Sequence, residues 1–179
     1  SESFKNAELK GNTGDGSSIT YELTGGATMA NTNSNRYFRW TTVGAYVAKG
    51  VTLCLSVMYK PVSGADEFCM EIAYTAGYST SQSWATIKPT DQLEIEQTDG
   101  WVLRYGLWTP PDNATLKLVD MGSGTTHAGT GNYTNKFSLL HPMLQYGNAP
   151  TAWNASSGDY LTQESAKSLF SQTADEIKT

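Results

Sequence analysis

Alternation of apolar and polar side chains over short segments is the feature that most constrains the fold of this chain. Between residues 51 and 59 every odd position is apolar, and the segments 67–74 and 101–108 repeat this period of two. Successive side chains of a β-strand point to opposite faces of a sheet, so the pattern predicts strands with one apolar face. Shorter segments of the same kind cover 19–23, 36–40, 93–96, 116–119 and 137–144. Because turn-forming residues separate these segments, we predict a two-sheet antiparallel sandwich.

Composition narrows the range of partners. Only 16% of the 179 residues are charged, yet the chain contains 5 Trp and 10 Tyr. The net charge of −5 and the pI near 4.9 argue against a surface that binds nucleic-acid phosphates. No apolar run approaches the roughly 20 residues that span a bilayer. We therefore expect neither a nucleic acid nor a membrane as partner. We expect instead that the chain is a β domain that binds neutral polar ligands.

The character of the sequence changes after Trp153. Residues 154–159 resemble a polar linker, and residues 160–179 have the spacing of a helix with a weak apolar stripe. Such a polar helix does not fold alone. We expect residues 1–153 to form one domain and residues 160–179 to begin a helical, oligomeric stalk. Because the chain begins with Ser1 rather than Met, we also expect a processed or excised segment.

Two cysteines, Cys54 and Cys69, lie inside predicted strands. Two thiols in a chain of this size are not a disulfide framework, and buried free thiols are the simpler interpretation. A turn lies between them, so a disulfide across a hairpin remains an alternative. A zinc site with His127 and His141 lacks the usual ligand spacing.

The segment 141–153, HPMLQYGNAPTAW, resembles the closing motif of sandwich domains in minor structural proteins of siphophage tails. In those proteins a strand of the type P-x-L-E-x-G continues into N-x-x-T-x-W and a polar linker. The matching positions here are Pro142, Leu144, Gly147, Asn148, Thr151 and Trp153, with Gln145 where Glu is usual. Segments 46–56, 99–111 and 171–178 are similar to other parts of the same family.

This resemblance implies a galactose-binding-like jelly roll akin to family 4/9 carbohydrate-binding modules. The fold class we expect is therefore an all-β, antiparallel jelly-roll β-sandwich with a short C-terminal helix that begins the stalk. The resemblance further implies an extracellular, virion-associated protein of the tail or baseplate. Its implied partners are host cell-wall or surface polysaccharide, other tail proteins and further copies of the chain. We expect no cofactor, although related modules often hold a structural calcium ion, for which Asp15 is the local candidate.

Saccharide sites combine an exposed aromatic ring, which stacks on the C–H face of a sugar, with polar groups for its hydroxyls. Two groups of residues fit this description. The first lies in the segment 74–84 and comprises Tyr78, Gln82 and Trp84. The second comes from strand faces that we expect to point outward: Arg39, Glu71, Arg104 and Trp108. The structural alternatives are that Trp84 closes the core and that the charged residues form a solvated pair. Trp101, Tyr105 and Trp153 are assigned to the core or its seal.

Two other function classes remain open. Glu94 and Glu96 fall on one face of a short strand, as do the two carboxylates of jelly-roll glycosidases. Acidic residues on an edge strand more often form a solvated edge that prevents aggregation. A purely architectural spacer without any ligand also accounts for the low charge and the helix. The prediction we favour is non-catalytic binding of host cell-surface saccharide, and thus no enzymatic activity.

Overall fold

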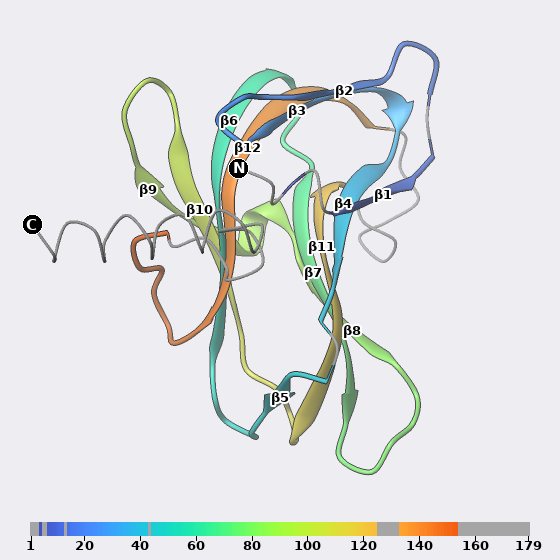
Figure 1. The fold of residues 1–179 in the computed structure, drawn as a ribbon, viewed down its shortest axis with the longest axis vertical. Helices are drawn as coiled ribbons and strands as arrows, with labels where there is room; N and C mark the ends of the chain where they lie inside the picture. Colours follow the sequence, from blue (N-terminus) through green and yellow to red (C-terminus); the bar gives the residue numbers. More distant parts are fainter. Residues whose placement is uncertain (1–3, 5–6, 13, 43, 125–132, 154–179) are drawn as a thin grey trace, which may run out of the picture.

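Two antiparallel β-sheets packed face to face form the protein (Figure 1). The computed structural model describes residues 4, 7–12, 14–42, 44–124 and 133–153. Sheet A has the strand order β1–β4–β11–β7–β8, with β5 paired to β11, and sheet B has the order β2–β3–β12–β6–β10–β9. The predicted all-β jelly-roll sandwich is confirmed. The predicted linker 154–159 and stalk 160–179 lie outside the described residues.

Each sheet collects strands from distant parts of the sequence. Sheet A consists of β1 (Glu8–Gly11), β4 (Arg36–Thr41), β5 (Tyr46–Val47), β7 (Phe68–Ala76), β8 (Ser83–Ile87) and β11 (Ala114–Ser123). Sheet B consists of β2 (Ser18–Tyr21), β3 (Ala27–Ser34), β6 (Leu53–Gly64), β9 (Leu93–Glu96), β10 (Val102–Trp108) and β12 (Tyr133–Tyr146). A short 3-10 helix, Pro89–Asp91, connects β8 to β9. Consecutive strands often switch sheets, so side chains far apart in sequence meet on each face.

The core between the sheets follows the predicted alternation on β6 and β7. Leu55 and Val57 of β6 and Met70 and Ile72 of β7 are completely buried. They pack with Phe38, Phe68, Phe137, Leu116, Met121 and Leu139 in one hydrophobic cluster. Burial of this apolar surface is the main force that holds the two sheets together.

The orientation of β10 differs from the sequence prediction. Arg104 and Trp108 pair with Val57 and Leu53, whose side chains lie in the core, so they also point between the sheets. A Cβ atom at Gly106 would lie 2.7 Å from Ile87 Cγ2, which places this position on the inward face too. Both faces of β10 contain large apolar residues. Alternation therefore identified the strand but could not determine which face is buried.

Strand β3 includes an Asn-rich segment that lacks apolar alternation and was not among the predicted strands. The buried Asn31 donates from Nδ2 to Oδ1 of Asn135, 2.8 Å away on β12. The hydroxyl of buried Ser34 donates to Oδ1 of Asn31 at 3.3 Å. Buried polar groups are tolerated where they are paired in this way. Mutual hydrogen bonding, which sequence periodicity does not reveal, thus allows an Asn-rich segment to form an interior strand.

Candidate functional site on the outer face of sheet A

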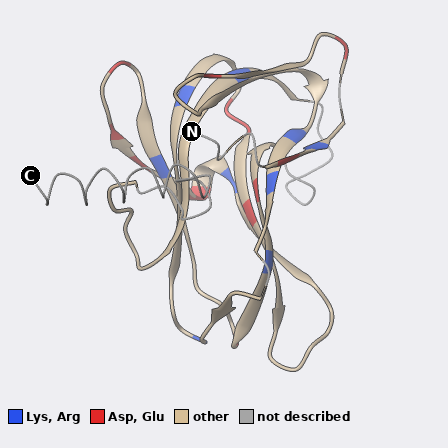
Figure 2. Cartoon of the chain, in the orientation of Figure 1, with Lys and Arg blue, Asp and Glu red and all other residues tan. Residues whose placement is uncertain are grey.

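A row of polar side chains crosses the outer face of sheet A. The strand register aligns Arg39 of β4 with Asp120 of β11, Asp120 with Glu71 of β7, and Glu71 with Thr86 of β8. The sequence neighbours of these residues, such as Phe38 and Ile72, lie in the core. Because side chains alternate along a strand, the row points away from sheet B. Figure 2 shows the acidic segments of β7 and β11 beside a basic segment of β4.

Asp120 holds Arg39 in a fixed orientation. Nε and Nη2 of Arg39 donate to Oδ1 and Oδ2 of Asp120, each over 2.8 Å. The Asp120 side chain is fully buried, whereas 19% of the Arg39 side chain remains exposed. The hydrogen bonds to Asp120 raise the pKa of Arg39 above its ordinary value. This two-bond geometry fixes the plane of the guanidinium, so its outer edge is presented in one orientation.

Glu71 occupies the next position in the row and is also fully buried. Its Oε2 atom accepts a hydrogen bond of 2.9 Å from the hydroxyl of Thr86. Two buried carboxylates, Glu71 and Asp120, therefore lie on neighbouring strands of an outward face. Buried carboxylates are costly unless they are paired or hydrogen-bonded, and here Asp120 is paired with Arg39 while Glu71 is bonded to Thr86.

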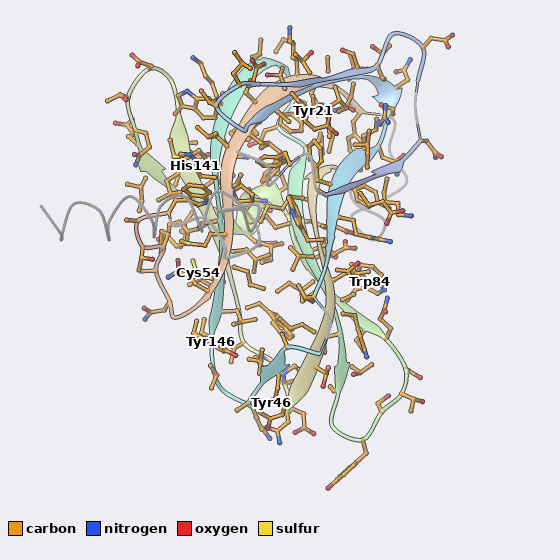
Figure 3. All side chains as sticks on the ribbon, in the orientation of Figure 1. Tyr21, Tyr46, Cys54, Trp84, His141 and Tyr146 are labelled. Carbon is orange, nitrogen blue, oxygen red and sulfur yellow. The ribbon has the colours of Figure 1, made fainter. Side chains whose placement is uncertain are left out.

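Two aromatic rings flank the guanidinium of Arg39. Its Cζ atom lies 5.6 Å from the ring centre of Tyr37 and 5.8 Å from that of Trp84. Both distances allow a cation–π attraction. Trp84 is half-buried on β8 and does not belong to the hydrophobic core, which corrects the alternative that it closes the core. Figure 3 shows Trp84 on the side of β8 that faces away from sheet B.

Small residues beneath the rings let them lie close to the sheet. Trp84 is paired in register with Ala73 of β7. Tyr37 is paired with Gly122 of β11, where an added Cβ atom would lie 2.7 Å from Tyr37 Cβ. Larger side chains at these two positions would push the rings outward. The guanidinium of Arg39 is thus flanked by the half-buried ring of Trp84 and the buried ring of Tyr37.

The predicted loop residues Tyr78 and Gln82 lie beyond this surface. Both are exposed in the connection between β7 and β8, which extends past the end of sheet A in Figure 1. Tyr78 is fully exposed. The loop leads directly into Trp84, but neither side chain has a hydrogen bond or ring contact to the Arg39 row among the described contacts. Their part in a site stays a prediction.

Arg104 lies inside the sandwich, so the prediction that its side chain points outward is wrong. Its Nη1 atom donates to Oδ1 of Asp66 at 2.9 Å, and its Nε atom donates to Oε1 of Glu94 at 3.1 Å. Its Cζ atom lies 3.8 Å from the ring centre of Tyr59, and only 5% of the residue is exposed. Burial lowers the pKa of Arg104, but the hydrogen bonds to Asp66 and Glu94 more than offset this, so the pKa is raised.

Trp108 also leaves the predicted outward group. It packs against the core, with its ring centre 4.6 Å from that of Tyr74. Trp153 lies beside the bulge of β12, where it stacks on His141 at 4.2 Å and donates from Nε1 to the carbonyl of Pro142; it is not a member of the core cluster. Trp101 and Tyr105 are half-buried and are not members of the core cluster. Trp108, predicted to point outward, thus packs on the core, whereas Trp101, predicted to belong to the core, lies outside the core cluster.

Tyr37, Thr86 and Asp120 are the site residues that sequence reasoning missed. Asp120 is the one carboxylate in the segment LKLVDMGS, and Tyr37 precedes Arg39 by two positions. A carboxylate within a buried strand and an arginine with an aromatic residue at i−2 were the available signals. What the sequence could not supply was the pairing of β4 with β11.

The metal and carboxylate-pair alternatives rest on Asp15, Glu94 and the two cysteines, whose surroundings the structure describes. No group of three or more His, Cys, Asp or Glu side chains comes together among the described residues, so Asp15 lacks the acidic neighbours of a calcium cage. Glu94 is held by Arg104 in an ion pair.

Cys54 and Cys69 are free, and they lie on different sheets. Burial raises the pKa of Cys54 to about 11, which disfavours its thiolate. Within the part of the chain that the structure describes, we find no helix suited to crossing a bilayer.

Comparisons with known proteins give remote structural likenesses. No protein-family model matches, and a search of curated proteins finds no significant match. The chain is similar to the CBM22-1–GH10 modules of xylanase 10B from Clostridium thermocellum, with 15% identity, 78% of this chain and 26% of that chain covered, and a TM-score of 0.48. It is similar to the enzymatically active domain of tailspike protein 4 from bacteriophage CBA120, with 10% identity, 80% and 20% coverage and a TM-score of 0.49.

A third likeness is to the CBM22-1 xylan-binding domain of Xyn10C from Paenibacillus barcinonensis, with 15% identity, 79% and 87% coverage and a TM-score of 0.41. The chain thus spans about a quarter of the first of these proteins and a fifth of the second. Every one of these TM-scores is below 0.5. The function is therefore argued from the side chains of this chain.

Proposed function

We propose that this protein binds saccharide, without catalysis, on the outer face of sheet A. The observation that carries the proposal is the half-buried Trp84 ring beside Arg39, whose guanidinium is fixed by the buried Asp120. The indole offers a flat apolar surface for the C–H face of a sugar ring. Asp120 takes two of the five N–H donors of the guanidinium, and the proposal assigns the donors at the exposed edge to hydroxyl oxygens of the sugar.

The fixed orientation of the Arg39 guanidinium makes this surface selective for particular hydroxyl positions. A sugar hydroxyl that enters a closed site without a partner costs about 1–3 kcal/mol, so donors must be in place before binding. Arg39 meets this requirement because both its rotamer and its plane are fixed by Asp120 and by the rings of Tyr37 and Trp84. We further propose that Tyr78 and Gln82 extend the site along the β7–β8 loop. A shallow site of this kind binds weakly and gains strength from multiple copies.

The biological setting we propose is adhesion of a phage tail or baseplate protein to host cell-surface polysaccharide. The resemblance of residues 141–153 to siphophage tail domains supports this setting. Display of several copies through an oligomeric stalk would supply the avidity that a weak site needs. The protein would then be extracellular and attached to the virion, with other tail proteins as neighbours.

The experiment fuses the chain to a fluorescent protein and measures binding to a panel of purified neutral polysaccharides and to host cells. We expect the wild type to bind at least one of them, and Trp84→Ala and Arg39→Lys each to weaken binding about tenfold. Tyr105→Ala is the matched control, because Tyr105 is a half-buried aromatic residue on the other sheet.

The outcomes separate the function from the site. Absence of binding to every saccharide would contradict the function and favour an architectural spacer. Saccharide binding that is unchanged in both Trp84→Ala and Arg39→Lys would contradict the site. Release of reducing sugar that disappears in Glu96→Gln would instead show a hydrolase.

A further inference from the structure

A separate recess of about 620 Å³ lies on sheet B, remote from the Arg39 row. Its lining includes the hydroxyl residues Thr20, Thr28 and Ser138, the two lysines Lys60 and Lys136, and Trp101. These residues belong to β2, β3, β12, β6 and the start of β10. Figure 2 shows basic segments on the curved upper part of sheet B, where β6 and β12 lie.

The hydroxyl residues form a row across four strands. Thr20 pairs with Thr28, Thr28 with Ser138, and Ser138 with Lys60 in the strand register. The neighbouring positions Met29, Phe137 and Tyr59 belong to the core, so the row points outward. With strands about 4.8 Å apart, the row is about 14 Å long and ends at Lys60. Short side chains in the row explain why the surface is hollowed there.

One end of this recess is basic and aromatic. The Nζ atom of Lys60 lies 5.9 Å from the ring centre of Trp101. Among the described residues neither Lys60 nor Lys136 forms an ion pair. The acidic member of the lining, Glu22, accepts a hydrogen bond of 3.3 Å from Thr28, toward the opposite end of the row. The recess therefore carries two unpaired ammonium groups in a chain whose net charge is −5.

The hydroxyls supply the neutral part of a binding surface. Thr28 and Ser138 hydrogen-bond to each other through their hydroxyl oxygens at 2.7 Å. Each hydroxyl has both donor and acceptor capacity, so the pair retains lone pairs for a polyhydroxylated ligand. Trp101, half-buried beside Lys60, supplies an apolar wall for stacking.

We propose that this recess is a second binding site, specific for a sugar or polyol chain that carries an anionic group. The carboxylate or phosphate of the ligand would lie between the ammonium groups of Lys60 and Lys136. Its sugar ring or carbon backbone would pack on Trp101, and its hydroxyls would bond to Thr28 and Ser138. This site is independent of the proposed neutral-saccharide site, because the two lie on the outer faces of different sheets.

The test uses the chain of 179 residues and three defined probes of equal length. They are a uronic acid oligosaccharide, a glycerol phosphate oligomer and a neutral glucose oligosaccharide, and binding is measured by isothermal titration calorimetry. We expect at least one anionic probe to bind, and the affinity to fall when salt is raised from about 50 to about 300 mM. The probe that binds distinguishes a carboxylate from a phosphate source.

Variants test the residues of the recess. The double variant Lys60→Gln with Lys136→Gln is expected to weaken binding of the anionic probe at least tenfold and to remove most of its salt dependence. Trp101→Ala is expected to weaken it about tenfold. Lys117→Gln, which changes an exposed lysine on sheet A, is the matched control for charge, and Trp84→Ala is the control for the other site. Neither control is expected to change the affinity.

Three results would overturn this proposal. The first is that neither anionic probe binds. The second is that the double lysine variant binds the anionic probe with the same affinity as the wild type. The third is that the neutral probe binds as tightly as the anionic probes, independently of salt and in a way that depends on Trp101. None of them bears on the sheet A site, which is tested with neutral saccharides and with Trp84→Ala. Loss of neutral-saccharide binding in Trp84→Ala, with anionic binding intact, would show that the two sites are separate.

Discussion

Arg39 and Arg104 have the same kinds of partner, carboxylates and aromatic rings, but they lie in different places in the fold. Arg39 hydrogen-bonds to one carboxylate and Arg104 to two, and each arginine lies near two aromatic rings. Arg39 is on the outer face of sheet A with a fully buried carboxylate beneath it, whereas Arg104 is inside the sandwich with half-exposed carboxylates at the rim. The guanidinium of Arg39 is therefore partly open to solvent, whereas that of Arg104 is buried and paired inside the protein.

This difference shows that the kind of contact does not by itself identify a functional arginine. What matters is which partner is buried. A buried Asp120 leaves an edge of Arg39 for a ligand, whereas burial of Arg104 between Tyr59 and Phe68 leaves no such edge.

The largest effect is expected for Arg104→Ala. This change removes hydrogen bonds to Asp66 and Glu94 and leaves a cavity against Tyr59, so the free energy of unfolding should fall by about 3 kcal/mol. Urea denaturation measures the change. Saccharide binding by the folded fraction should be unaltered. A loss below about 1 kcal/mol would contradict a structural role.

A smaller loss is expected for Trp108→Ala, because its ring packs on Tyr74 but is only partly buried. The unfolding free energy should fall by about 2 kcal/mol, without effect on saccharide affinity. Trp84→Ala is the matched change on the outer face and should show the reverse, with a stability loss below about 1 kcal/mol and a tenfold loss of affinity. Thermal unfolding and a saccharide titration of both variants decide the question. Equal behaviour of the two variants would remove the distinction between the regions.

Arg39→Lys tests whether the geometry of the guanidinium, and not only its charge, is needed for binding. Lysine keeps a positive charge beside Asp120 but lacks the planar fork that makes two parallel hydrogen bonds. We expect about a tenfold loss of saccharide affinity, while the unfolding free energy falls by only about 1 kcal/mol. Undiminished affinity, measured by calorimetry, would mean that charge alone is sufficient at this position.

The smallest effect concerns His141, which stacks on Trp153 at the bulge of β12. Burial lowers the pKa of His141 below 6.5 in the folded state. The unfolded chain therefore binds this proton more readily, and the unfolding free energy should decline as the pH falls below 6.5. His141→Asn removes the titrating group and tolerates the positive φ of 57°. Urea denaturation across this pH range should show a flatter profile for the variant, and an equally steep profile would rule out His141 as the source.

The sequence predicted the fold class well, because alternation over β6 and β7 is unambiguous and each of these strands has one clearly apolar face. It failed for β3, where paired amides replace apolar contacts, and for the orientation of β10, where both faces are apolar. Of the site, it identified Arg39, Glu71 and Trp84. It missed Asp120 and Tyr37 because their roles depend on the pairing of β4 with β11, which local patterning does not encode.

The central claim is that Trp84 and Arg39 bind saccharide on the outer face of sheet A. Its most direct test is an NMR titration of the isotopically labelled chain with the neutral saccharide that binds best in the polysaccharide panel. We predict that the indole N–H signal of Trp84 and the Nε–H signal of Arg39 shift progressively and saturate together, while the indole N–H signals of Trp101 and Trp108 stay in place. Saturable binding that leaves the Trp84 and Arg39 signals unmoved would contradict the claim.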